Sequence, residues 1–134
     1  MSTISSAPVQ KKNSLAKLTR NSKIFKAIIK AIQEKKGEKI ISLDLRKIHE
    51  AVADFFVICE ASNPTLLHAI AQNVEFIVKN ETGEMPYKHE GHQGQQWIIV
   101  DYINIVVHVM LPEPRHFYNL EDLWHDAPAA KHDD

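Results

Sequence analysis

The chain has 134 residues, a length typical of one domain with an extension. Its hydrophobic fraction of 44% permits a buried core, and its formal net charge of −1 lacks the basic excess typical of nucleic-acid binders. No apolar run approaches the roughly 20 residues of a membrane-spanning helix, and the N-terminus has no continuous apolar stretch of a secretory signal. Cys59, the single cysteine, lies in an apolar run, so we expect a buried thiol in a reducing compartment.

The two ends of the chain differ in charge. The sequence from Met1 to Gln33 has no acidic residue, whereas residues 128–134 end in acidic side chains. Residues 1–21 also lack a sustained apolar period, so we predict a disordered basic extension there and an acidic tail at residues 128–134. A transit peptide, a disordered leader and a basic binding arm all fit this N-terminus; we favour a cytoplasmic protein.

Helix and strand signals alternate between these ends. Ser22 is the predicted cap of a first helix, and Gly37 is its predicted end. Asn63 and Pro64 predict the start of a second helix, which Gly83 ends. The expected elements are a helix between residues 22 and 37, strands at 38–45 and 54–60, a helix at 64–82, a strand at 85–90, a hairpin within 95–110 and a short helix at 115–124.

The hairpin carries the strongest pattern, because two β-branched and aromatic runs flank a short polar break. A two-residue loop at Tyr102 and Ile103 would pair Trp97 with His108 across the strands. Side chains alternate along a strand, so the hairpin has two different faces. One face is wholly apolar and must be covered by helices: Ile98, Val100, Ile105, Val107 and Val109. The other face is mixed: Trp97, Ile99, Asp101, Val106, His108 and Met110.

The strand, helix and strand across residues 54–90 predict a right-handed crossover and a parallel pair, whereas the hairpin is antiparallel. The expected fold is therefore a small mixed α/β sheet with helices mainly on one face. The chain has few amphipathic segments left to cover the mixed hairpin face. That face is either a second layer of core or a surface that docks another protein, and we favour docking.

The short segment after the hairpin supports a binding function. Arg115, His116 and Tyr118 add hydrogen-bond donors beside Trp97, and Trp, Tyr and Arg dominate the energetics of protein interfaces. His108 could stack on the indole of Trp97 and present a ring nitrogen to a partner. The helix itself is expected to turn Phe117, Leu120 and either Leu123 or Trp124 inward.

Catalytic and metal-binding patterns are weaker. Two histidines, His89 and His92, lie three residues apart in a glycine-containing turn region, without the spacing of the zincin motif or further zinc ligands. Asp44, Asp54 and Asp101 lie near strand ends, where metal-dependent enzymes place carboxylates, although such residues more often form caps and turns. No phosphate-binding glycine loop or nucleophile elbow is present. We therefore expect no metal and no cofactor.

Four ordered blocks of the sequence resemble the ribosomal silencing factor family, RsfS, also called the Iojap family. The blocks are Ala53 to Cys59, His89 to Gly91, Trp97 to Tyr102 with Val106 to Val109, and Arg115 to Trp124. The resemblance runs from about residue 22 to residue 127, which defines the expected domain. The family hairpin usually has glycine where this chain has Ile103, and the basic N-terminal arm lies outside the resemblance.

The resemblance implies a domain related to the nucleotidyltransferase fold but lacking its catalytic motif. It also implies binding to the large ribosomal subunit through the ribosomal protein uL-fourteen, steric exclusion of the small subunit, repression of translation when nutrients are scarce, and a homodimer. A weak contact between the basic arm and ribosomal RNA fits the same picture. The contact role carries over to Trp97, Asp101, His108, Arg115 and Tyr118, and less directly to Met110 and Ile99. The alternative is a nucleotidyltransferase-like enzyme that uses Asp44, Asp54 or Asp101 with magnesium.

Overall fold

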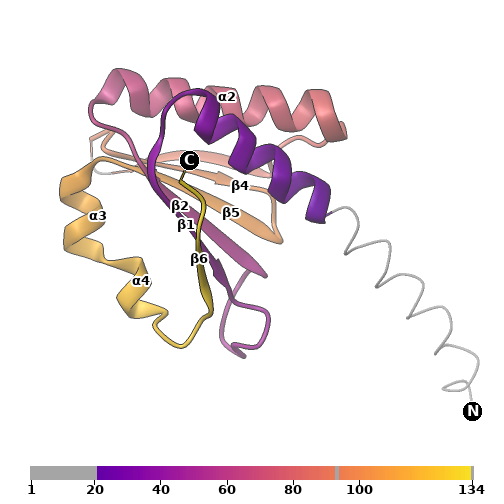
Figure 1. The fold of residues 1–134 in the computed structure, drawn as a ribbon, viewed down its shortest axis with the longest axis vertical. Helices are drawn as coiled ribbons and strands as arrows, with labels where there is room; N and C mark the ends of the chain where they lie inside the picture. The colour runs from indigo at the N-terminus through magenta and orange to yellow at the C-terminus, as the bar shows by residue number, and fades with distance from the viewer. Residues whose placement is uncertain (1–20, 93, 134) are drawn as a thin grey trace, which may run out of the picture.

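The computed structural model describes residues 21–92 and 94–133 (Figure 1). The predicted N-terminal extension therefore lies, apart from Asn21, outside the described residues. The described chain forms a helix at residues 21–34, β1 (Glu38–Asp44), β2 (Phe55–Glu60), α2 (Pro64–Thr82), β3 (Lys88–His92), β4 (Trp97–Asp101), β5 (Ile105–Met110), α3 (Pro112–Tyr118), α4 (Leu120–Leu123) and β6 (Ala129–Lys131).

The strands form one mixed sheet in the order β3-β4-β5-β2-β1-β6, which confirms the predicted fold class. Strands β2 and β5 are parallel, and the other paired strands are antiparallel. The predicted parallel pairing of β2 with the next strand in sequence is wrong. The α2 crossover carries the chain to the sheet edge at β3, and the β4–β5 hairpin then fills the space between β3 and β2.

The helix at residues 21–34 and α2 cover one face of the sheet (Figure 1). The predicted apolar face of the hairpin packs beneath them, and each of its side chains is at most 1% exposed. Burial of one such aliphatic side chain stabilises the folded state by about 1.5–3 kcal/mol. Cys59 is fully buried in the same core, which confirms the expected buried thiol, and this burial raises the pKa of the thiol to about 12.

Local signals set the ends of α2 as predicted. The side chain of Asn63 accepts a hydrogen bond from the Leu66 amide at 2.8 Å, and Gly83 ends the helix with a φ of 78°. The predicted cap of the first helix is wrong, because the chain is already helical at Asn21, before Ser22. Gly37 does follow that helix. Its backbone lies so close to the Ile32 side chain that a Cβ atom at this position would be 2.4 Å from Ile32 Cγ2.

The hairpin register differs from the predicted one by two residues. Trp97 pairs with Met110 and Ile99 with His108, and the Tyr102 amide donates to the Ile105 carbonyl at 2.9 Å. The loop is therefore centred one residue later than predicted. An even shift leaves every side chain on the face expected for it, because side chains alternate with a period of two.

The prediction that the mixed hairpin face is open is wrong. Val106 and Met110 on this face belong to a second buried cluster, and Trp97 and Ile99 pack against it. Small elements provide the cover: Leu45 and Ala53 beside the β1–β2 loop, and Leu120, Trp124 and Ala127 near the C-terminus. The inward packing of Leu120 and Trp124 agrees with the sequence analysis, whereas the segments that carry Leu45, Ala53 and Ala127 are too short to show an amphipathic period and were not predicted.

Part of the predicted acidic tail is structured. Strand β6 pairs with β1, His132 Nε2 lies 2.7 Å from Ser42 Oγ, and Asp133 Oδ1 accepts a hydrogen bond from the Ile40 amide at 3.0 Å. These contacts close the β1 edge of the sheet. Among the described residues, no helix is long and apolar enough to cross a membrane.

Candidate functional site

The segment after the hairpin forms two helices where one was predicted. Asn119 has a φ of 43°, ends α3 and caps α4, with its side chain accepting a hydrogen bond from the Asp122 amide at 3.3 Å. Asparagine tolerates this left-handed conformation better than most residues. The break rotates the two helices relative to each other, so Leu120 and Trp124 pack inward while Phe117 and Leu123 face solvent.

Aromatic rings connect the core to this surface. Trp97 is half-buried, and its Nε1 donates a hydrogen bond to His108 Nδ1 at 3.1 Å. The ring of Tyr118 lies 5.1 Å from Trp97, and the ring of Phe117 lies 5.0 Å from Tyr118. A continuous aromatic row therefore runs from β4 to the outside of α3.

Several side chains predicted to contact a partner do not reach the surface. Met110 is fully buried, His108 is 5% exposed and Arg115 is 6% exposed. His108 does lie against the Trp97 indole, at 5.8 Å and 44°, but it packs on Phe56 instead of facing solvent. Of the aromatic pair expected at the site, Trp97 is half-buried and Tyr118 is 39% exposed.

Arg115 has a structural role. Its Nη1 donates to the Lys39 carbonyl at 2.6 Å and lies 3.5 Å from Glu60 Oε2, while its Nη2 donates to Glu121 at 3.0 Å. Lys39 adopts a φ of 49° at an irregularity in β1, which turns its carbonyl toward the guanidinium. Arg115 thus joins α3 and α4 to the ends of β1 and β2.

The surface residues that the sequence pattern missed are Phe117, which is 77% exposed, and Leu123, which is 66% exposed. We define the α3–α4 patch as Phe117, Tyr118 and Leu123. Asn119 followed by leucine and two acidic residues is a helix-capping signal, and it could have revealed the break that turns these side chains outward.

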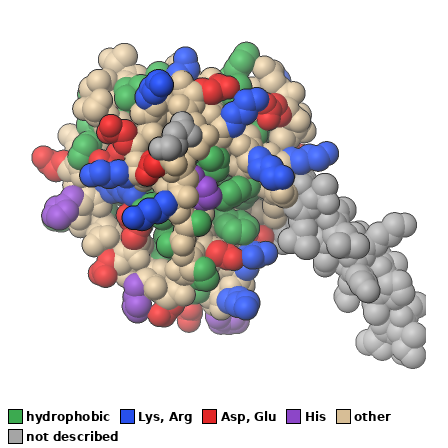
Figure 2. Space-filling view, viewed as in Figure 1, with side chains coloured by type: hydrophobic (Ala, Val, Ile, Leu, Met, Phe, Trp, Pro, Cys, Tyr) green, Lys and Arg blue, Asp and Glu red, His purple; other side chains and the backbone are tan. Residues whose placement is uncertain are grey.

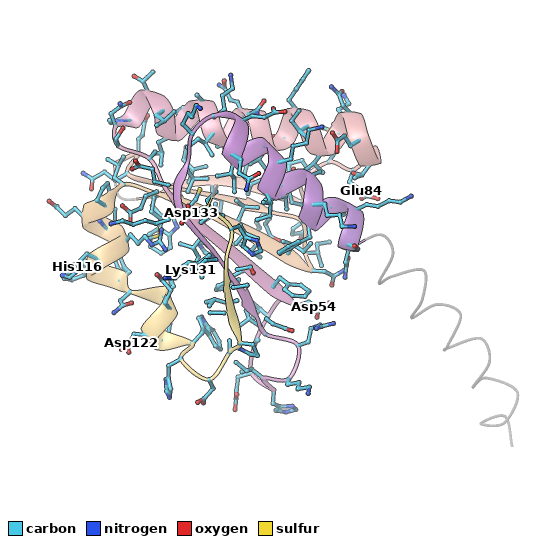
Figure 3. All side chains as sticks on the ribbon, viewed as in Figure 1. Asp54, Glu84, His116, Asp122, Lys131 and Asp133 are labelled. Atoms are coloured by element: carbon cyan, nitrogen blue, oxygen red, sulfur yellow. The ribbon has the colours of Figure 1, made fainter. Side chains whose placement is uncertain are left out.

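The segment that carries the α3–α4 patch also has exposed acidic side chains. Glu113, Asp122 and Asp126 are exposed on or beside the two short helices. Figure 3 shows Asp122 and His116 pointing away from the sheet. The nearby Arg115 does not offset this charge at the surface, since it is buried against Glu60 and Glu121.

The aspartates of the enzyme alternative lie at the ends of β1 and β4 and directly before β2. Arg46 donates hydrogen bonds to both carboxylate oxygens of Asp44, at 2.9 and 2.7 Å, and thereby lowers the pKa of that carboxyl. Asp101 Oδ1 accepts from the Ile103 amide at 2.6 Å, and the Asp54 amide donates to the Asn104 carbonyl at 2.8 Å. In residues 21–92 and 94–133, no three His, Cys, Asp or Glu side chains are grouped to hold a metal ion.

A groove of about 570 Å³ lies between α3 and the β1–β6 edge. Its walls include Lys39, Glu60, Arg115, Lys131 and Asp133, so opposite charges face one another across it. Arg115 and Glu60 already bind each other there. The groove is accordingly part of the ionic framework that holds α3 in place.

Comparison with known proteins assigns the family. Residues 19–134 match the family model described as "Ribosomal silencing factor during starvation", RsfS. A ribosomal silencing factor RsfS from Bacillus subtilis is 38% identical over 107 residues, which cover 80% of this chain and 89% of the relative. Another, from Halalkalibacterium halodurans, is 32% identical over 111 residues, covering 83% of this chain and 93% of the relative.

Related proteins extend to structures and to mitochondria. A crystal structure from Chromobacterium violaceum superimposes with a TM-score of 0.70 at 33% identity, covering 78% of this chain and 85% of the other. The mouse protein named "Mitochondrial assembly of ribosomal large subunit protein 1" is 38% identical over 73 residues, which cover 53% of this chain and 32% of that protein. With a family model matching nearly the whole domain and relatives this similar, the chain belongs to the ribosomal silencing factor family.

Proposed function

We propose that this protein represses translation by binding the large ribosomal subunit and sterically preventing its association with the small subunit. The proposed partner is the ribosomal protein uL-fourteen, in the cytoplasm. The mechanism requires binding and exclusion only, with no catalytic step. An interface of about 800 Å² per partner is enough for a specific complex.

The α3–α4 patch carries this proposal. Phe117 is an exposed aromatic side chain and Leu123 an exposed aliphatic one. Exposed apolar residues within a polar rim are typical of docking sites. The ring of Tyr118 lies 5.1 Å from that of Trp97, which packs against the second core and so supports the patch from the inside. Aromatic residues fixed in this way lose little conformational entropy on binding.

The acidic rim indicates what kind of partner fits. Glu113, Asp122 and Asp126 would face a positively charged protein surface with an apolar centre. We assign Asp101 to the hairpin turn and not to the contact. We assign a supporting role beneath the contact surface to three buried residues, His108, Met110 and Arg115. The homodimer and the contact between the basic arm and ribosomal RNA are additions to this proposal, and binding to the subunit does not require either.

The proposal can be tested by sedimentation with separated ribosomal subunits. The parent chain is expected to sediment with large subunits and not with small subunits. Replacing Phe117 by Ser removes an exposed apolar anchor, and we expect binding to weaken by about 2 kcal/mol, the range of an interface hot spot.

The matched control is Phe76→Ser on α2, which removes a phenylalanine that is 61% exposed on the opposite side of the sheet. This control should sediment like the parent. Co-sedimentation with small subunits, or equal binding by Phe117→Ser and the parent, would contradict the proposal.

A further inference from the structure

The helix at residues 21–34 carries a row of cations along its solvent side. Lys23, Lys26 and Lys30 are all exposed. Their spacing of three and four residues places them on one helical face, and a rise of 1.5 Å per residue spreads Lys23 and Lys30 over about 10 Å. Figure 2 shows blue side chains along this part of the molecule.

Two of these cations are available for a ligand. Lys23 and Lys26 form no ion pair with another described residue, whereas Lys30 pairs with Glu81, a contact that raises the pKa of Lys30. Glu34 is the only acidic residue within residues 21–34. In a chain with a net charge of −1, this helix is therefore a local concentration of positive charge.

The buried face of the helix argues against insertion into a membrane surface. Ile24, Ile28 and Ile32 are at most 1% exposed and belong to the first core. A helix that binds a membrane surface inserts its apolar face among the acyl chains, and this one cannot do so without unfolding the core. A partner recognised through phosphate charges alone fits better.

We propose that Lys23 and Lys26 bind the sugar-phosphate backbone of RNA. The inference deepens the proposed function, on which it rests for its place on the ribosome, because it adds an RNA contact to the protein contact of the α3–α4 patch. The two surfaces lie on opposite sides of the sheet (Figure 1). Both can therefore be occupied in one complex.

The test uses the full chain and a fluorescently labelled single-stranded RNA of mixed sequence, with anisotropy measured as salt is raised. Each phosphate neutralised on a single strand contributes about 0.7 to the slope of log affinity against log salt. The double variant Lys23→Gln/Lys26→Gln should therefore reduce the slope by about 1.4. Between about 50 and 200 mM salt, its affinity should fall about sevenfold less than that of the parent.

The matched control is Lys47→Gln/Lys88→Gln, which removes the same charge from exposed positions outside the helix. Its slope should equal that of the parent, and Lys23→Arg/Lys26→Arg should restore the parent slope, because both replacements keep the positive charge. Circular dichroism of each variant checks that the helix is intact. Phe117→Ser should leave the slope unchanged, so a failed RNA contact and a failed protein contact give different results.

Three outcomes would overturn the inference. The first is no RNA binding by the parent at low salt. The second is an equal fall in slope for the helix variant and the control, which would assign the effect to net charge. The third is lysine-dependent binding to vesicles of phosphatidylserine and phosphatidylcholine without lysine-dependent RNA binding, which would assign the helix to a membrane surface.

Discussion

At the tip of the β4–β5 hairpin, Ile103 has a φ of 73° and is 56% exposed. The Asn104 amide donates to the Tyr102 carbonyl at 2.9 Å, so Ile103 is the centre of a tight turn. Such a conformation of a β-branched residue costs about 1–3 kcal/mol. The Ile103 amide donates a hydrogen bond to Asp101 Oδ1 at 2.6 Å, which offsets part of this strain.

Ile103→Gly should therefore stabilise the protein. Glycine adopts positive φ without the steric penalty but loses more chain entropy on folding, so we expect the free energy of unfolding to rise by about 1 kcal/mol, measured by urea denaturation. Ile103→Ala is the control: it removes the same exposed side chain while keeping the Cβ atom, and should gain less. A decrease in stability for the glycine variant would contradict the turn geometry.

Tyr102, beside this turn, is 4% exposed, and its hydroxyl has no hydrogen-bond partner among the described residues. Burial raises the pKa of this phenol because it disfavours the anion, and the charge of Glu75 adds to the effect. An unsatisfied buried hydroxyl is unfavourable. Tyr102→Phe should leave the free energy of unfolding unchanged or raise it by about 1 kcal/mol. A loss of comparable size would show that the hydroxyl is hydrogen-bonded in solution.

The packing of α3 against the sheet depends on the buried ion pairs of Arg115. Removing one partner of a buried ion pair leaves the other charge uncompensated and typically costs about 3–5 kcal/mol. Arg115→Ala should lower the free energy of unfolding by this amount, because Glu60 is also buried. His116→Ala changes the adjacent, exposed residue and should have an effect within about 0.5 kcal/mol. Equal stability of the two variants would remove the structural role assigned to Arg115. Any loss of ribosome binding in Arg115→Ala should be measured per folded molecule.

The accuracy of the sequence predictions follows the range of the interactions that form each element. Asn63, Pro64 and Gly83 act within one helical turn, and the sequence correctly predicted both ends of α2. The hairpin faces were also correct, because they depend only on alternation. Its register was wrong, since it depends on the turn at Ile103, a residue that rarely adopts positive φ.

Elements fixed by distant contacts could not be predicted. Strand β6 is short and exposed, and its conformation depends on pairing with β1. The same holds for the part of the second core that Leu45, Ala53 and Ala127 cover, because these residues lie on separate short segments that meet only in the folded chain. At the candidate site, the residue types were recognised as interface types, but the Asn119 break and the burial of Arg115 and Met110 decided which of them reach the surface.

In the whole molecule, one sheet supports two chemically different surfaces. The helix at residues 21–34 on the first face presents a row of lysines, and the short helices on the second face present apolar and acidic side chains. In the proposed mechanism, occupancy of the large subunit through the second face prevents subunit joining.

A subunit-joining assay distinguishes this mechanism from binding without exclusion. Large subunits are saturated with the parent chain, with the double variant Phe117→Ser/Leu123→Ser or with Phe76→Ser, small subunits are added, and the fraction of joined ribosomes is measured by sedimentation. The parent and Phe76→Ser should reduce joining in proportion to the large subunits occupied, and the double variant should reduce it much less. If the parent saturates large subunits and the joined fraction is unchanged, the steric account is wrong.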